Sequence, residues 1–188
     1  NTEICPGPAQ CGVMQTGFPM PFANTGLPAP NDFTNSAGIF DYTSGTATTT
    51  LNGQFVRMSD NCGAASASAS GSISLGGTNG QHDCTTPGSG GAGNTSASRS
   101  GFYELNKLGE QARGWLPSNT WLQGQVTANM NLNQTCNAFW DGSTVNFYRS
   151  GGGCANTGEI PGVSLHEWGH GIDANDGNAA ISEYGTGE

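Results

Sequence analysis

Residues 163–176 read VSLHEWGHGIDAND and contain the pattern HExxH. His166 and His170 are one helical turn apart, so on an α-helix their imidazoles lie on one face and can share a metal ion. Imidazole nitrogens bind Zn2+ well, and a site with three protein ligands keeps one position open for water. Zinc lowers the pKa of such a water, and a carboxylate within hydrogen-bond reach can take its proton. We therefore expect a metal-binding helix here, with Glu167 as the general base.

A third metal ligand must come from outside the HExxH pattern, and two spacings compete for it. In the first, Asp176 follows His170 by six residues, where HExxHxxGxxH-type peptidases place their last ligand. Those peptidases need a glycine at the intervening turn, and Asp173 stands at that place here. In the second, a glutamate on a later helix returns to the metal. The candidates for this role are Glu183 and Glu188.

The segments before the HExxH pattern predict a helix and three strands. Residues 100–117, SGFYELNKLGEQARGWLP, place apolar side chains three to four apart and stop by a proline, as an amphipathic helix does. Residues 125–133, QVTANMNLN, alternate apolar and polar side chains, which is typical of a strand with one buried face. The segments NAFWDG and TVNFYRS predict two further strands, because Asp141-Gly142 between them is a strong hairpin signal.

Residues 1–97 have a different composition. Glycine supplies 31 of the 188 positions and charged residues only 10%, which argues against an all-helical bundle. Prolines punctuate residues 1–40 and predict an extended, irregular start, while short strands are expected at 48–55 and 70–75. Residues 76–98, which include His82, predict a long surface loop. The sequence thus predicts an α+β protein: a β-rich, Gly/Ser/Thr-rich region, 1–97, followed by a unit with an edge strand and the HExxH helix, 98–188.

Charge and cysteine content restrict the partners and the compartment. The formal net charge is -9, which repels phosphate backbones and anionic headgroups, and no run approaches the roughly 18 apolar residues of a membrane span. We therefore expect no nucleic-acid partner and no membrane insertion, but a secreted chain whose export signal has been removed. Six cysteines without a CxxC pair indicate three disulfides in an exported protein. Pairing of sequence neighbours predicts Cys5–Cys11, Cys62–Cys84 and Cys136–Cys154.

The order NAFWDGSTVNFY, HEWGH and then a glutamate in the Gly-rich segment GTGE resembles the thermolysin-like zinc peptidases and their fungalysin relatives, the gluzincins. The resemblance covers residues 98–188 and implies a zincin-type unit, the N-terminal half of the catalytic unit of a secreted zinc endopeptidase. In this family the NAFW edge strand pairs with the bound peptide, so Asn137 and Ala138 are the implied substrate-binding residues. The implied zinc ligands are His166, His170 and Glu188, with Glu167 as the base.

The sequence also departs from that family. The family's oxyanion tyrosine lies between the second histidine and the glutamate, where Tyr184 is the candidate here, although its spacing differs. The aspartate that orients the first histidine and the C-terminal helical domain are absent from this chain. We therefore expect a second chain or a continuation of the polypeptide to complete the cleft. Asp173 and Asp176 are alternative Ca2+ ligands, but helix capping is the favoured interpretation.

A non-catalytic function is the main alternative. The Gly/Ser/Thr-rich composition of residues 1–97 is compatible with an exported surface or fibre subunit. In such a subunit the HExxH pattern would be a structural metal site or an inert relic.

Overall fold

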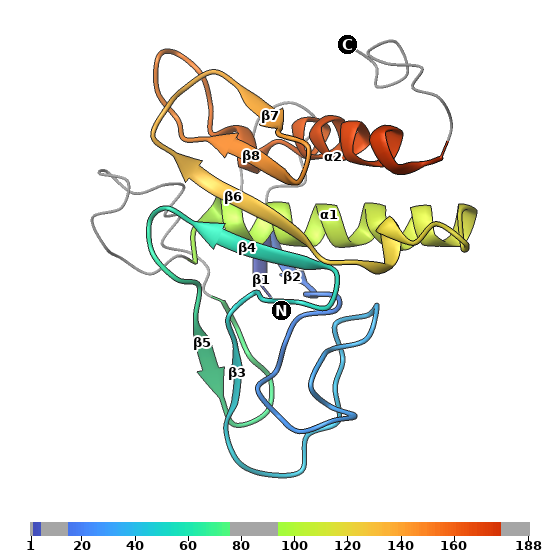
Figure 1. Ribbon diagram of the computed structural model, residues 1–188. Coiled ribbons are helices and arrows are strands. Elements are labelled where there is room, and N and C mark those ends of the chain that lie inside the picture. Colours follow the sequence, from blue (N-terminus) through green and yellow to red (C-terminus); the bar gives the residue numbers. More distant parts are fainter. Residues whose placement is uncertain (1, 5–14, 76–93, 178–188) are drawn as a thin grey trace.

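The computed structural model describes residues 2–4, 15–75 and 94–177, and these form a mixed α+β structure (Figure 1). Two antiparallel pairs and a four-stranded sheet are combined with two α-helices among these residues. The strands are β1 Thr2–Ile4, β2 Gln15–Phe18, β3 Ala47–Thr49, β4 Val56–Asp60, β5 Ala67–Ala69, β6 Val126–Leu132, β7 Ala138–Trp140 and β8 Thr144–Tyr148. The helices are α1 Ser96–Trp115, η1 Trp121–Gln123, η2 Thr157–Glu159 and α2 Pro161–Asn175. No described helix is both long and apolar enough to cross a membrane.

The four-stranded sheet has the order β4-β6-β8-β7. Strands β4, β6 and β8 are parallel, whereas β7 runs antiparallel to β8 and forms one edge. Strand β4 joins β6 through α1, as parallel neighbours require a long crossover. One strand of this sheet therefore comes from residues 1–97, and the other three come from residues 98–188.

Both α-helices pack against the sheet and against each other. Helix α1 contacts β4 and β6, α2 contacts β7 and β8, and α1 contacts α2 (Figure 1). Apolar side chains of alternate strand positions meet the helices, and burial of each large side chain contributes about 1.5–3 kcal/mol. The fully buried residues of this core include Phe102, Leu105, Met130, Val145 and Phe147. The core therefore fixes α2 against the edge-strand side of the sheet.

The predictions for the C-terminal half are largely confirmed. Strand β6 covers most of residues 125–133, and β7 and β8 form the predicted hairpin. Gly142 adopts φ +96° in its turn, and the Asp141 carboxylate accepts hydrogen bonds from Ser143 and Thr144. Partial burial raises the pKa of Asp141, but these hydrogen bonds outweigh it and hold the pKa well below its usual range. This turn is thus stabilised in the ionised form.

Several predictions for the N-terminal half are wrong. Residues 70–75 form no strand, and in 48–55 only Thr48 and Thr49 belong to one. Strand β4 follows immediately after that segment and was not expected. Helix α1 begins at Ser96, inside the predicted loop, because the buried Thr95 caps it by accepting a hydrogen bond from the Ser98 amide.

One predicted disulfide is confirmed. Cys136 and Cys154 are bonded, with their Cα atoms 5.2 Å apart. Cys62 is also disulfide-bonded. The remaining cysteines, Cys5, Cys11 and Cys84, lie outside the described residues, so the pairings assigned to them stay predictions.

A buried polar network joins β4, α1 and β6 where the parallel strands end. Asp60 Oδ2 accepts hydrogen bonds from the hydroxyls of Thr95 and Ser98 at 2.7 and 2.6 Å. Asp60 Oδ1 accepts from Asn131 Nδ2 and from the Cys62 amide at 2.9 and 2.8 Å. Thr95, Ser98 and Asn131 are fully buried, so their donors have no access to bulk water. The carboxylate also lies at the N-terminus of α1, where the helix dipole favours negative charge.

We expect Asp60→Ala to destabilise the protein by about 3 kcal/mol, because it leaves several buried donors unsatisfied. Urea unfolding followed by circular dichroism measures this change. Asp41→Ala is the matched control, since Asp41 is exposed and its removal should alter stability by less than about 0.5 kcal/mol. Equal effects of the two substitutions would show that the network contributes nothing.

Candidate metal centre

Helix α2 presents one buried face to the core and its histidines to a less buried side. Pro161 occupies its first turn, where a missing amide hydrogen costs nothing. The buried positions Ser164, Glu167, Trp168 and Gly171 follow the spacing of one helical face. The two histidines lie outside this buried set and are half-buried. The packing of α2 therefore orients the HExxH residues relative to the sheet.

The predicted histidine pair converges in the structure. The Nε2 atoms of His166 and His170 are 3.0 Å apart, and the two rings are nearly perpendicular, with centroids 4.6 Å apart. Two nitrogens bound to one tetrahedral zinc lie about 3.3 Å apart, given bond lengths near 2.0–2.1 Å. The spacing of the two Nε2 atoms is close to that value, so the pair fits a shared zinc ion.

Glu167 completes the group of candidate metal-binding atoms. One ligand atom from each of His166, Glu167 and His170 lies within 4.8 Å of the others, and no other such group of three occurs among the described residues. The Glu167 residue is only 5% exposed. The carboxylate therefore lies beside the imidazoles on a buried helix face, and its role as the base stays a prediction.

The candidates for the third ligand lie only partly within the described residues. Asp173 lies within α2 and Asp176 is its C-cap residue, and the structure does not bring either into the His-Glu-His group. Glu183, Tyr184 and Glu188 lie outside the described residues. The two alternatives for the third ligand therefore remain predictions.

A tryptophan cluster fastens the edge strand to α2. The ring of Trp121 of η1 lies edge-to-face against Trp140 of β7 and tilted against Trp168 of α2, with ring centroids 6.0 and 5.4 Å apart. Trp168 is buried and Trp140 packs on the core, as expected for core aromatics. Gly171 is essential to this contact, because a Cβ there would lie 2.8 and 2.9 Å from two Trp121 ring atoms. A Cβ at Gly171 would also lie 3.4 Å from the Trp140 ring.

We expect Gly171→Ala to destabilise the protein by about 1–3 kcal/mol, because the added methyl group overpacks the rigid indole rings. Thermal unfolding monitored by tryptophan fluorescence detects both the loss of stability and the displaced rings. Gly114→Ala is the matched control in α1, since nothing lies within 4 Å of its added Cβ. The control should be neutral or slightly stabilising, and equal behaviour of both variants would contradict the packing argument.

The free side of the edge strand has a defined set of backbone groups. Tyr148 donates its amide hydrogen to the Asn137 carbonyl at 3.3 Å, and Asp141 donates to the Thr144 carbonyl at 3.2 Å. Hydrogen-bonded and non-hydrogen-bonded pairs alternate along an antiparallel ladder, so the backbone groups of Ala138 and Trp140 point away from β8. Among the described strands β7 has a neighbour on one side only. The backbone groups of Ala138, a residue that is 8% exposed, thus face the open edge, whereas the Asn137 carbonyl is engaged within the sheet.

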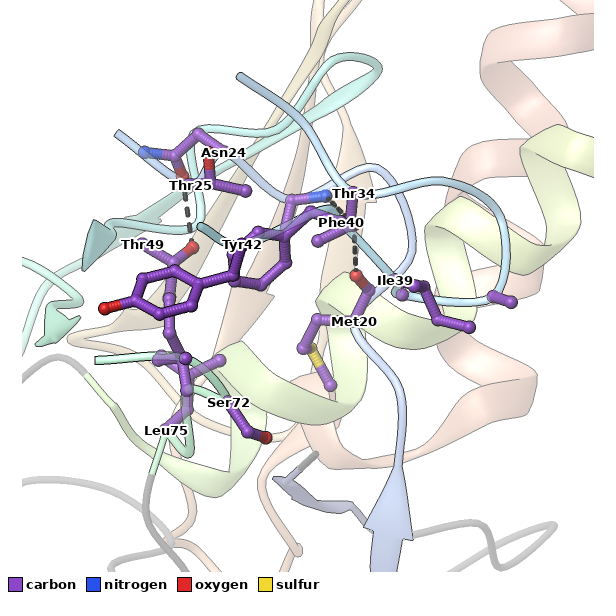
Figure 2. A pocket seen from close by; sticks show the side chains of 15 residues that line it. Met20, Asn24, Thr25, Thr34, Ile39, Phe40, Tyr42, Thr49, Ser72 and Leu75 are labelled. Carbon is purple, nitrogen blue, oxygen red and sulfur yellow. Dashed lines mark hydrogen bonds between the residues drawn. The ribbon is translucent and has the colours of Figure 1, made fainter. Parts of the chain in front are cut away.

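A separate cavity of about 330 Å³ lies in the N-terminal region (Figure 2). Its lining is mainly apolar and includes Met20, Ile39, Phe40, Tyr42 and Leu75. It contains no histidine, cysteine or carboxylate among its lining residues, so it offers no metal ligands. Strands β3 and β5 of this region project away from α2 (Figure 1). The cavity is therefore not part of the candidate metal centre.

Comparisons with known proteins return no assignment. No protein-family model matches the sequence, and no curated protein matches it significantly. The function has to be argued from the chemistry of the site itself.

Sequence reasoning missed the residues that support the site from outside α2. Trp121 lies on η1, and Thr157 on η2 contacts β7 and β8 through hydrogen bonds. Neither residue belongs to a motif, because these contacts join segments far apart in the sequence. Gly171 could have been identified in part, since a glycine in the interior of a predicted helix often indicates a close packing contact.

Proposed function

We propose that this protein is a secreted zinc-dependent endopeptidase of the gluzincin class. The observation that carries the proposal is the convergence of His166 Nε2 and His170 Nε2, 3.0 Å apart, beside the buried Glu167. The resemblance of the HExxH, NAFW and GTGE segments to that class agrees with this geometry. The zincin-type unit comprises α1, the four-stranded sheet and α2 in this proposal.

In the proposed site His166 and His170 hold the metal, with Glu188 as third ligand. The chemistry that a bound zinc ion supplies is Lewis acidity, which lowers the pKa of a water molecule to about 7 and polarises a carbonyl. Glu167 accepts the proton of the attacking water and then delivers it to the leaving amine. Glu167 is only 5% exposed, so its carboxylate is largely screened from bulk water beside the two imidazoles. Tyr184 is the candidate stabiliser of the developing oxyanion.

The substrate in this proposal is an extended peptide that pairs with β7. The outward backbone groups of Ala138 and Trp140 provide the hydrogen bonds of strand addition. The exposed Asn137 side chain offers a further contact. Since β7 packs against α2, a peptide on this edge would pass close to the helix that carries the histidines.

Secretion is part of the proposal and is supported by the cysteines. Cys136–Cys154 is a disulfide, and Cys62 is also bonded. Structural disulfides persist in oxidising, extracytoplasmic compartments. A continuation of the polypeptide or a second chain is proposed to form the opposite wall of the cleft.

A non-catalytic exported subunit with a structural metal site is the second candidate. The observation that favours it is the Gly/Ser/Thr-rich composition of residues 1–97. Casein hydrolysis by the native protein, with and without a chelator, separates the two candidates. Zinc-dependent hydrolysis supports the peptidase, and binding of zinc without any hydrolysis supports the subunit.

The third ligand is tested by removing each candidate separately. Loss of an outer-shell partner costs 10–100-fold in metal affinity, so loss of the direct ligand in Glu188→Gln is expected to cost at least about 100-fold. Asp176→Asn should leave zinc affinity unchanged. Competition titration with a zinc-sensitive dye measures both variants. If Asp176→Asn weakens binding and Glu188→Gln does not, the gluzincin assignment is wrong and the Asp176 alternative holds.

A further inference from the structure

The hydroxyl of Thr157 closes the end of the β7–β8 ladder. The Tyr148 amide, which donates to the Asn137 carbonyl at 3.3 Å, also donates to Thr157 Oγ1 at the shorter distance of 2.9 Å. The same hydroxyl can donate to the carbonyl oxygens of Asn137 and Tyr148, which lie 3.0 and 3.1 Å from Oγ1. Thr157 is 8% exposed, so water cannot readily replace these bonds. One side chain from η2 therefore binds Tyr148 of β8 and Asn137, the residue immediately before the edge strand.

The η2 turn that carries Thr157 is itself fixed to the middle of the molecule. Asn156 Oδ1 accepts a hydrogen bond from the Gly158 amide and so caps the turn. Asn156 Nδ2 donates to Asn131 Oδ1 at 2.6 Å, and Asn131 in turn donates to Asp60. Both asparagines are buried. The turn thus has a rigid attachment to β6 and, through Asp60, to β4 and α1.

The same turn leads directly into the metal-binding helix. Thr157–Glu159 is followed by Ile160, the N-cap of α2. On the other side, the Cys136–Cys154 disulfide ties the residue before Asn137 to the loop that leads to η2. The edge strand and the start of α2 are therefore both anchored to η2, the first by hydrogen bonds and a disulfide and the second by continuity of the chain.

We propose that Thr157 is a positioning residue that sets the place of the β7 edge strand relative to the HExxH helix, and so the binding of the peptide substrate. This inference rests on the proposed function. The carbonyl of Asn137 is held inward by Thr157, which keeps the backbone groups of Ala138 turned outward, because successive residues of a strand face opposite sides. The role requires the hydroxyl group and not merely the volume of the side chain.

The test compares Thr157→Val, which keeps the shape and removes the hydroxyl, with Thr157→Ser, which keeps the hydroxyl. In the native protein with zinc, Thr157→Val is expected to raise KM for an extended peptide about 10-fold, with kcat changed less than about 2-fold, as for lost uniform binding. Thr157→Ser should restore KM, and both variants should bind zinc as the unsubstituted protein does. An unchanged KM in a folded Thr157→Val variant, or a zinc affinity that falls while KM rises, would overturn the inference.

Amide hydrogen exchange gives a reading that does not depend on activity. The Tyr148 amide should be protected in the unsubstituted protein and in Thr157→Ser, and should exchange at least about 10-fold faster in Thr157→Val. Rapid exchange of the Tyr148 amide in the unsubstituted protein would contradict its hydrogen bond to Thr157, even if Thr157→Val failed to fold. If the unsubstituted protein binds zinc but hydrolyses no peptide, the proposed function fails. The proposed role of Thr157 in substrate binding fails with it, and faster Tyr148 exchange in Thr157→Val than in Thr157→Ser would then show that the hydrogen bond to Thr157 itself exists.

Discussion

Glu167→Gln is expected to lower kcat for peptide hydrolysis by about 100- to 10,000-fold, the usual contribution of a general base. The amide of glutamine has nearly the shape of the carboxylate but cannot accept a proton from water. Because Glu167 acts on the water molecule and is not itself one of the proposed zinc ligands, the variant should still bind zinc at one ion per chain. Hydrolysis of a fluorogenic peptide and zinc titration of the same sample measure both properties.

Glu104→Gln is the matched control for this variant. Glu104 is a half-buried glutamate on α1, outside the candidate metal group. Burial raises the pKa of its carboxyl, so a neutral side chain is well accommodated there. This control should keep kcat and KM within about 2-fold. If Glu167→Gln were as active as Glu104→Gln, the assignment of the base would be wrong.

His166→Ala and His170→Ala are each expected to reduce zinc affinity by at least about 100-fold, the amount that loss of even an outer-shell partner can cost. The two Nε2 atoms lie 3.0 Å apart, so removing either leaves the other without its partner in the site. Hydrolysis should disappear with the metal. Equilibrium dialysis against buffered zinc, followed by elemental analysis, gives the bound zinc directly.

His82→Ala provides the control, since His82 is the remaining histidine of the chain. It should bind zinc as the unsubstituted protein does. Full zinc occupancy in both His166→Ala and His170→Ala would place the metal elsewhere and remove the basis of the proposed function.

The fold could be predicted from the sequence where periodicity is strong and local. The alternation in residues 126–132 and the Asp141-Gly142 turn each specify structure within a few residues, and both β6 and the β7–β8 hairpin are found. The spacing of Phe102, Leu105 and Ala112 likewise predicted α1, and these side chains are buried. In these segments local preference and tertiary packing agree.

The N-terminal half was harder because its strands are short and its signals weak. Strand β4 has only five residues, VRMSD. It forms a strand because it pairs with β6, which follows α1 in the sequence. Helix α1 starts in a Ser-rich run, and the burial of Thr95 against Asp60 decides its first turn. Such contacts depend on residues distant in the sequence, which a local pattern cannot show.

The residues of the candidate site also fall into two groups, those that a local pattern predicts and those that it does not. The HExxH residues are adjacent on one helix, so their convergence followed from spacing alone. The supports of the site, Trp121, Thr157 and the Asp60 network, come from other elements and had no motif. Asn137 and Ala138 were identified by resemblance, and the structure adds that Ala138 faces the open edge while the Asn137 carbonyl faces inward.

The coordination of zinc in the zinc-loaded native protein tests the central claim most directly. X-ray absorption at the zinc edge distinguishes imidazole, carboxylate and thiolate ligands by their scattering and bond lengths. The account predicts two imidazole nitrogens at about 2.0–2.1 Å, with oxygen ligands completing the shell. A spectrum with one imidazole or none, or with sulfur ligands at about 2.3 Å, would contradict it.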